Sequence, residues 1–418
     1  MSKNKVFVLT LIASFDLLLI LLLLNGINIQ SLFPNQHTNS EAEQVLMSSL
    51  QNDDHEPFDY KPAAPYYDSL ELIKSARIPV GRGVKSVLIS PNQKYVYTLN
   101  LEGMSVYEID RVTLKKHREL RFIPTEGEGY DYSKREWIKS YQEKPVEGCF
   151  SHDGKYLWIS LHNAGGIVAW NLHHTEEYES RTKKAHIILS DNTREVTSLK
   201  FIPTGKTPKV ITKSTDGETL YVSNWHSNSV SVIDISSSDP DDWKKVTDLK
   251  TGAVPRGLLI SENDKKLYVN NMGGASISVL NLSTSQEDTV LKRMVTPRHI
   301  VQDDHYLYVT LSSPEKLVKI SKSDHYPILE QVTGDDPRTL DLSYDKGLLF
   351  CTSYGDDQLE VYRTSDLKRL GRWESKGGPV GVAVCQADSL IEAWVCNYKY
   401  ATLRVFRFQP IIYMQAKK

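Results

Sequence analysis

The chain has 418 residues, of which 40% are hydrophobic and 24% are charged, and its formal net charge is −2. This is the composition of a globular protein with enough apolar material for a substantial core. A near-neutral chain lacks the basic excess of general nucleic-acid binders, so no nucleic-acid partner is expected. Length alone would allow two or three domains, although an all-β chain of this size can form one unit.

The N-terminal residues differ from the rest of the chain. Residues 1–5 carry two lysines, and residues 6–25 are almost continuously apolar, with an unbroken Leu and Ile run at 17–24. The length fits one bilayer crossing, although Asp16 disfavours insertion by roughly 2.5–3.5 kcal/mol at mid-membrane. No A-x-A cleavage site follows, so an uncleaved signal anchor is favoured over a cleaved signal peptide. The lysines predict a cytoplasmic tip at 1–5 and an exported remainder, periplasmic or extracellular.

Residues 26–68 are expected to form a flexible linker between the membrane and the folded domain. The segment is polar, and its second half carries several prolines without sustained periodicity. The acidic cluster at 53–56 is expected to be solvated, because one short mobile run rarely supplies a closed set of metal ligands.

From about residue 69 the chain repeats one pattern. Residues 216–234, with the sequence DGETLYVSNWHSNSVSVID, suggest a tight turn, a buried strand, a polar loop and an alternating strand. Seven copies are present, with first strands starting at 84, 145, 208, 255, 297, 337 and 379. Each copy is followed by a third strand, and all but the last by a fourth. Seven units of about four strands predict a seven-bladed all-β propeller over residues 69–408.

The two ends of the repeat array are expected to pair with each other. The seventh repeat ends at 408 with three strands, and a strand-like segment at 70–78 stands unpaired before the first repeat. We predict that this N-terminal strand is the outer strand of the last blade, because the pairing removes two open edges. Residues 409–418 then form a C-terminal tail.

Several short peptides in the repeats resemble those of a known family. LYVSN at 220–224, LYVNN at 267–271 and LYVT at 307–310 are supported by SVID at 231–234 and by DG turns. These peptides resemble the YVTN-repeat β-propellers, which include bacterial YncE-like periplasmic proteins. The resemblance covers about residues 70–408 and implies the propeller fold and a bacterial source. It leaves the function open, since such propellers act as binding modules, lactonases or cofactor-holding domains.

Basic residues follow the start of most first strands, at the mouth of the predicted central channel. Five of the seven positions are basic, namely Lys85, Lys209, Arg256, Arg298 and Arg338. Like charges around one funnel repel, so they need an acidic partner, water or a bound anion. The planar fork of Arg suits carboxylate or phosphate. The structural alternative is that the arginines bond neighbouring carbonyls or carboxylates such as Asp335 and Asp336.

Two further groups of residues are expected on the same face. Polar residues at the ends of second strands and in the adjoining loop complete the predicted ligand-binding set, namely Asn224, His226 and Asn271. The insertion at 126–144 carries candidates for a lid, namely Tyr130, Tyr132, Trp137 and Tyr141. These rings could instead only pack on the propeller rim. A second, charged insertion at 173–196 is expected to be a solvated strand extension.

The sequence carries no common catalytic motif. G-x-S-x-G, H-E-x-x-H, Walker and dinucleotide-binding patterns are absent, and no metal or cofactor is predicted. Apart from Glu147, few acids face the channel, which disfavours a metal-assisted lactonase without excluding it. Four cysteines lie in strand-like runs as small buried hydrophobes, with disulfides left open: Cys149, Cys351, Cys385 and Cys396.

The sequence therefore predicts a membrane-anchored, exported propeller that binds a ligand through its Arg-rich face. The expected partner is an anionic small molecule, a glycan or a protein. A lactonase-like hydrolase is the first alternative. A cofactor-holding redox propeller is the second, with His162, His226 and His299 as axial ligand candidates by position only.

Overall fold

The computed structural model describes residues 65–412, apart from 132–133, 176, 179–180 and 262. The predicted cytoplasmic tip and membrane anchor, most of the predicted linker, and residues 413–418 of the predicted tail lie outside the described residues. Among the helices of the described part, none is long and apolar enough to cross a membrane.

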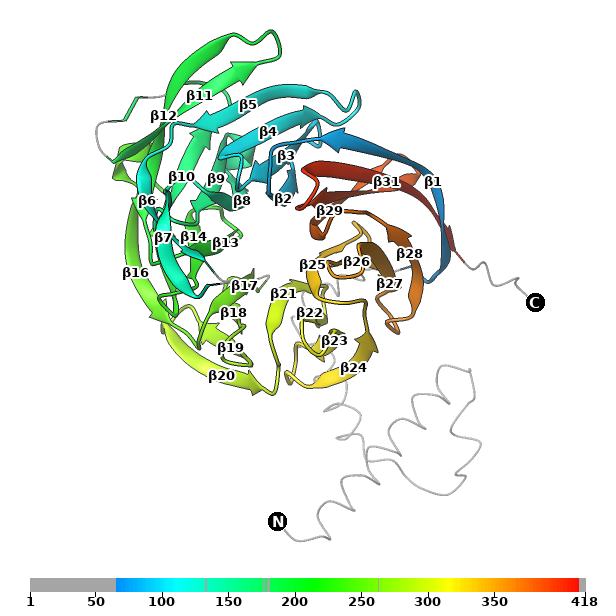
Figure 1. The fold of residues 1–418 in the computed structure, drawn as a ribbon. Helices are drawn as coiled ribbons and strands as arrows, with labels where there is room; N and C mark the ends of the chain where they lie inside the picture. Colours follow the sequence, from blue (N-terminus) through cyan, green and yellow to red (C-terminus); the bar gives the residue numbers. More distant parts are fainter. Residues whose placement is uncertain (1–64, 132–133, 176, 179–180, 262, 413–418) are drawn as a thin grey trace, which may run out of the picture. The chain divides into compact units, whose positions relative to one another are not determined.

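The described chain forms antiparallel sheets that stand around a common centre (Figure 1). Five sheets have four strands each, and a nine-stranded sheet contains two more four-stranded blades. The first strands of the blades face the centre, and each contacts the first strands of its two neighbours. The all-β propeller predicted from the repeats is confirmed.

The first two blades are joined into the nine-stranded sheet. Blade one consists of β2 (Val84–Ile89), β3 (Tyr95–Asn100), β4 (Ser105–Asp110) and β5 (Lys116–Phe122). Blade two consists of β8 (Pro145–Ser151), β9 (Tyr156–Leu161), β10 (Gly166–Asn171) and β12 (Arg194–Pro203), with a short 3-10 turn, η2 (His152–Gly154), after β8.

The next four blades follow the chain in order. Blade three consists of β13 (Pro208–Lys213), β14 (Thr219–Asn224), β15 (Ser229–Asp234) and β16 (Lys244–Lys250), with the 3-10 turn η3 (Pro240–Asp242) before β16. Blade four consists of β17 (Pro255–Ile260), β18 (Lys266–Asn271), β19 (Ser276–Asn281) and β20 (Gln286–Lys292). Blade five consists of β21 (Pro297–Gln302), β22 (Tyr306–Leu311), β23 (Lys316–Ser321) and β24 (Pro327–Val332). Blade six consists of β25 (Pro337–Leu342), β26 (Leu348–Ser353), β27 (Gln358–Arg363) and β28 (Arg369–Glu374).

The last blade joins the two ends of the described chain. It consists of β29 (Pro379–Ala387), β30 (Leu390–Asn397), β31 (Thr402–Ile412) and, as its outer strand, β1 (Tyr67–Pro79). Pairing runs from Tyr67 opposite Ile412 to Pro79 opposite Thr402, which confirms the predicted closure. Because β1 pairs along this whole length, β31 continues past the predicted end at 408. Buried Arg363 of β27 also holds β1 in place, since its Nη1 donates a hydrogen bond to the carbonyl of Tyr67 at 2.8 Å; we call this bond the clasp.

The two insertions form strands of their own. Residues 126–144 contain a hairpin of β6 (Glu126–Asp131) and β7 (Glu136–Tyr141). The second insertion was expected to be a solvated strand extension, and it does add a strand, but part of that strand is buried rather than solvated. Its strand β11 (Thr182–Leu189) pairs with β12 on one side and β5 on the other. Ala185, Ile187 and Ile188 of β11 are buried, because a strand between two blades has neighbours on both edges.

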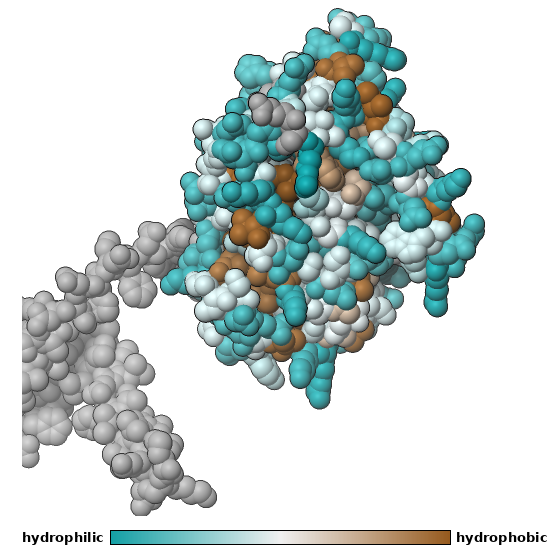
Figure 2. Space-filling model, turned by 90° about the vertical axis from the view of Figure 1, so that its left-hand side faces the viewer, coloured by the Kyte–Doolittle hydropathy of each residue, from teal (hydrophilic) through white to brown (hydrophobic). Residues whose placement is uncertain are grey.

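The core lies between neighbouring blades. The second strands are almost wholly buried, because each blade has another blade against both of its faces. Trp158 of β9, for example, packs with Ile211 and Leu220 of blade three. On the side shown in Figure 2, apolar residues are scattered among hydrophilic ones and do not form one broad patch. The four cysteines are free thiols, and Cys385 pairs across its hairpin with Glu392 and not with Cys396.

Candidate functional site

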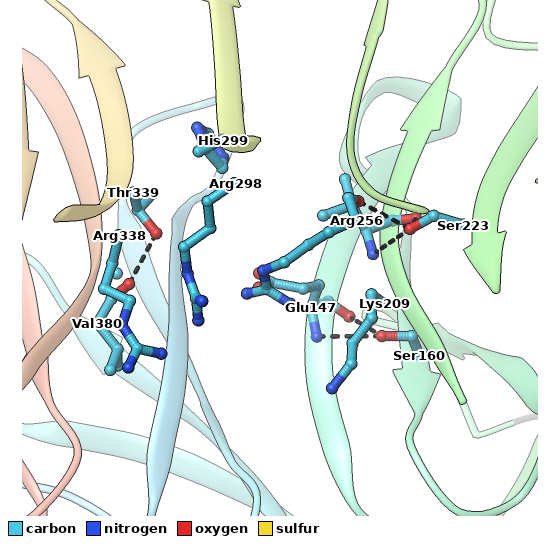
Figure 3. Close-up of polar contacts among 12 residues, drawn as sticks. Glu147, Ser160, Lys209, Ser223, Arg256, Arg298, His299, Arg338, Thr339 and Val380 are labelled. Atoms are coloured by element: carbon cyan, nitrogen blue, oxygen red, sulfur yellow. Dashed lines mark hydrogen bonds and ion pairs between the residues drawn. The ribbon is translucent and has the colours of Figure 1, made fainter. Parts of the chain in front are cut away.

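A backbone irregularity directs the basic residues into the central channel. All seven first strands have a register shift directly after their first residue, where one strand carries extra backbone relative to its partner. Such a bulge bends the strand and re-aims a side chain. The basic residues sit at these shifts. Figure 3 shows Arg298 and Arg338 on one side of the channel, and Arg256 and Lys209 on the other beside Glu147.

The backbone before the first strands is strained at four positions. Thr207, Val254, Thr296 and Asp336 have φ values of 58°, 58°, 46° and 48°. Thr207, Val254 and Thr296 are β-branched, and such residues rarely adopt this left-handed region, which costs on the order of 1–3 kcal/mol for each, whereas an Asp such as Asp336 tolerates it better. Each of the four precedes a proline that begins a first strand, so the strain lies directly beneath the channel mouth.

A second ring of side chains surrounds the basic one. In every blade, the residue after the second strand donates its N–H to the carbonyl of the residue before the first strand. This repeated bond places one side chain per blade at the mouth, namely Leu101, His162, Trp225, Met272, Ser312, Tyr354 and Tyr398. Several of these side chains contact the basic residues. The Lys209 Nζ lies 4.2 Å from the Trp225 ring centroid, and the Arg338 guanidinium lies 4.4 Å from that of Tyr354.

Together the rings and the β6–β7 hairpin enclose a cavity of about 510 Å³. All five basic residues line it, as do Tyr130 and Ile138 of the hairpin and Trp225, Tyr398 and His162 of the second ring. The volume is within the usual range for small-molecule sites. Its walls are therefore cationic at the base and aromatic at the sides.

Acidic side chains reach only some of the basic ones. Glu147 lies 3.4 Å from Arg256, measured between Oε1 and Nη2, and Asp336 pairs with Arg338. Arg298 Nη1 instead contacts the sulfur of Met272 at 3.9 Å, and Lys209 Nζ lies 3.0 Å from His162 Nδ1. The alternative in which the arginines pair with carboxylates thus holds for Arg256 and Arg338. It leaves Arg298, Lys85 and Lys209 without an ion pair to a carboxylate among the described residues.

The charge excess affects the protonation of the cavity. Burial, followed by repulsion from Arg298, Arg256 and Arg338, lowers the pKa of Lys85 to about 7. Burial and the neighbouring cations likewise lower the pKa of Lys209, and they lower that of His162, so that this imidazole is neutral at pH 7. The pKa of Arg298 is also lowered, yet a guanidinium does not lose its proton in proteins. The lysines are therefore the groups that can relieve the repulsion.

The remaining predicted site residues lie in different places. Asn224 and Asn271 are fully buried and do not line the cavity, which corrects the placement expected for them. Each Nδ2 donates to two serine hydroxyls of the next strand, so both side chains hold their own blades together. His226 lies at the rim, where its ring centroid is 5.4 Å from that of Tyr130 and 5.7 Å from that of Trp137.

The β6–β7 hairpin forms one wall of the cavity, and its role as a lid stays a prediction. Buried Glu143 accepts the N–H of Thr125 at 2.8 Å and the ammonium of Lys183 at 2.7 Å, which holds the base of the hairpin. The contacts with His226 hold its other end. Of the lid candidates, Tyr130 lines the cavity, Trp137 packs on the rim and Tyr141 is exposed. Tyr132 lies outside the described residues.

Further along the first strands, the channel holds a second cavity of about 290 Å³. Glu147, His299 and Asp341 are its titratable lining residues. Burial raises the pKa of Asp341 to about 7 and lowers that of His299 to about 3, so this histidine is neutral. Within the described residues, no group of three or more His, Cys, Asp or Glu is placed to hold a metal ion.

Known proteins share the fold and part of the sequence pattern. A sequence model of the family described as "Lactonase, 7-bladed beta-propeller" matches residues 194–302, from β12 to β21. A solved structure of a catalytically inactive variant of virginiamycin B lyase from Staphylococcus aureus, with quinupristin, is similar over 80% of this chain and 98% of its own, with a TM-score of 0.57 and 15% identity. No curated protein sequence matches.

These similarities support a β-propeller family. The family match covers well under half of the chain, and 15% identity carries the fold alone. Solved structures with this fold are numerous, with 1329 matching chains, so the likeness does not single out a function. The assignment to YVTN-repeat propellers stays a prediction.

The site combines predicted and unpredicted residues. The structure brings together the five predicted basic residues, and Tyr130 and His226 lie beside them. Five members of the second ring were not predicted, namely Leu101, Met272, Ser312, Tyr354 and Tyr398. A signal was present, since an aromatic residue or histidine follows the last residue of the second strand in four of the seven repeats.

Proposed function

We propose that this propeller binds a small molecule with carboxylate or phosphate groups in its cationic cavity. The observation that carries the proposal is the excess of cationic side chains around one cavity. The five basic residues of the first strands line it together with Lys144. Glu102, which also lines it, pairs with Lys144, while Glu147 and Asp336 pair with Arg256 and Arg338. Repulsion among buried cations costs free energy, which a bound anion would recover. Fork-shaped Arg–carboxylate contacts, at about 1.5–3 kcal/mol for each charged hydrogen bond, supply affinity and orientation.

The surrounding rings indicate what else such a ligand carries. Trp225, Tyr398 and Tyr130 line the sides of the cavity, and flat or sugar-like rings pack well against aromatic faces. We therefore favour an anion attached to a ring or short glycan over a bare inorganic ion. The membrane anchor predicted at 6–25 would hold this binding module on the exported side of a membrane.

Thermal stabilisation tests the proposal. The full-length protein is heated with citrate, pyrophosphate, a sugar phosphate or a uronic acid, at constant ionic strength set with NaCl. Binding to the folded state alone stabilises by RT ln(1 + [L]/Kd), or about 2.7 kcal/mol at a hundredfold excess over Kd. We expect saturable stabilisation by at least one anion, and its loss when Arg256, Arg298 and Arg338 are all changed to Gln. Equal shifts from every anion and from NaCl would defeat the proposal.

A hydrolase or lyase is a second candidate. The lactonase-family match over β12 to β21 favours it, and His162 offers a neutral base beside the cationic cavity. Turnover of a lactone panel, with and without EDTA, tests this role and its metal dependence. Activity that is lost in His162→Gln but kept in the rim variant His226→Gln would make the cavity an active site.

A further inference from the structure

Lys85 has fewer polar contacts than the other basic residues of the cavity. It lies on β2, and its Nζ is 4.5 Å from the centroid of the Tyr398 ring. Among the described residues it has no hydrogen bond or ion pair. Lys209 differs, because its Nζ contacts His162 Nδ1 as well as the Trp225 ring. Lys85 is thus an amine that lines a ligand-sized cavity and is not engaged by an acceptor.

The arginines around Lys85 favour the loss of its proton. Arg256, Arg298 and Arg338 line the same cavity and keep their charge, so the lysine ammonium is repelled from several sides. The acids nearby are already paired, since Glu147 pairs with Arg256, Asp336 with Arg338, and Glu102, which lines the same cavity, with Lys144. A lysine beside other cations in a desolvated site is an activated nucleophile. The same arginines suit a ligand carboxylate.

We propose that Lys85 forms a reversible imine with the carbonyl group of a ligand that also carries a carboxylate, such as a 2-oxo acid. This inference rests on the proposed anion binding and names the class of ligand. The arginines hold the carboxylate, and the carbonyl carbon then lies within reach of the lysine amine. Tyr398 covers one side of Lys85 and limits the access of water.

The chemistry balances without an oxidant or a reductant. The lysine nitrogen donates its lone pair to the carbonyl carbon, and the carbonyl oxygen takes up a proton to give a carbinolamine. Loss of water then forms the C=N bond. Protonation of this imine returns a positive charge to the position of Lys85, which the carboxylate of the ligand offsets.

Reductive trapping tests the inference. The full-length protein is incubated with glyoxylate or pyruvate and cyanoborohydride, and the adduct is located by intact-mass measurement and peptide mapping. We expect one major adduct per chain, at Lys85. Its formation should be at least tenfold faster with pyruvate than with ethyl pyruvate, which lacks the carboxylate. Citrate should slow it, and it should speed up between pH 6 and pH 8.

Two variants distinguish an adduct at Lys85 from adducts at other lysines. Lys85→Arg keeps the charge and should lose the cavity adduct, whereas Lys316→Arg, at a partly exposed lysine of β23 outside the cavity, should keep it. Adducts spread over surface lysines, or equal rates for pyruvate and its ethyl ester, would overturn the imine. If citrate stabilises the protein but Lys85 is not trapped, the imine is refuted and anion binding stands. If Lys85 is trapped while no anion stabilises the protein and citrate does not compete, the anion proposal fails.

Discussion

Replacing Arg298 with Gln should have opposite effects on the free and the anion-bound protein. Arg298 lies on β21 between Arg256 and Arg338, and its contact is with the sulfur of Met272 rather than with a carboxylate. Burial and then repulsion from those two arginines lower its pKa, so its charge is unfavourable in the empty cavity. The variant should therefore raise the Tm of the free protein and reduce its stabilisation by anions.

The expected magnitudes follow from simple electrostatics. Two unit charges about 7 Å apart repel by ~2.4 kcal/mol at an effective dielectric constant of ~20. Losing the attraction to Glu147 and Asp336 offsets part of this, so a net gain of ~1–2 kcal/mol is expected. For a folded unit of about 350 residues this corresponds to roughly 1–3 °C. An anion at a hundredfold excess over Kd stabilises wild type by ~2.7 kcal/mol, or about 4 °C, and a thirtyfold loss of affinity leaves about 1 °C.

The assay is differential scanning fluorimetry at one scan rate, with anion titrations at fixed ionic strength. Arg372→Gln is the matched control, because Arg372 is an exposed residue of β28 that carries the same charge outside the cavity. The control should leave the anion response of wild type unchanged. A lower Tm in the free Arg298→Gln protein together with an unchanged anion response would refute the reasoning, since Arg298 would then be structural.

Three further predictions concern pH, the hairpin and ring closure. Folded Lys85 loses its proton near pH 7 and unfolded Lys85 near 10.5, so the unfolded state binds more protons between these values. Lys85 alone should therefore raise free-protein stability by at most ~1.4 kcal/mol per pH unit and lower anion affinity by at most tenfold per unit, in addition to the contribution of Lys209. Lys85→Met should reduce both slopes by the Lys85 contribution, and unchanged slopes would contradict this assignment. Glu143→Ala removes the carboxylate that pairs with Lys183 and holds the base of the β6–β7 hairpin. We expect faster proteolysis at 126–144 and severalfold weaker anion binding. A proteolysis rate equal to wild type would argue against this role of Glu143. Arg363→Met removes the clasp to Tyr67 and the pair with Asp366, so Tm should drop by several degrees with anion affinity unchanged; an unchanged Tm would show that β1 closes the ring without it.

The repeat pattern made the blades predictable, and local chemistry made the basic ring predictable. The same turn residues and the same alternation of apolar and polar residues recur along the chain. Each repeat therefore forms the same unit and packs against the units before and after it. The closing role of β1 followed from a missing fourth strand. The position after the first residue of each first strand correctly predicted which side chains face the channel, because a bulge occurs there in every blade.

Other parts of the site depend on contacts that a single repeat does not show. Asn224 and Asn271 looked like mouth residues, yet the Nδ2 of each donates to serines within its own blade. The second ring is created by a bond between two loops of one blade, and only its geometry shows which side chain faces the cavity. A strand extension was expected where β11 lies, but its burial was not, because its lysines and histidine obscured an apolar face that the two flanking blades bury.

Backbone strain and repulsion among the basic side chains both occur at the mouth of the central channel. Because both are unfavourable for folding, their coincidence favours a functional role for this place. Left-handed φ angles at Thr207, Val254 and Thr296 lie directly before the prolines that position Lys209, Arg256 and Arg298. Each unfavourable term could be removed by an ordinary substitution, glycine for the strain and an apolar side chain for the charge. A ligand that is anionic would turn the repulsion into attraction, whereas a neutral one would leave it in place, which is the reason that the proposed ligand carries negative charge.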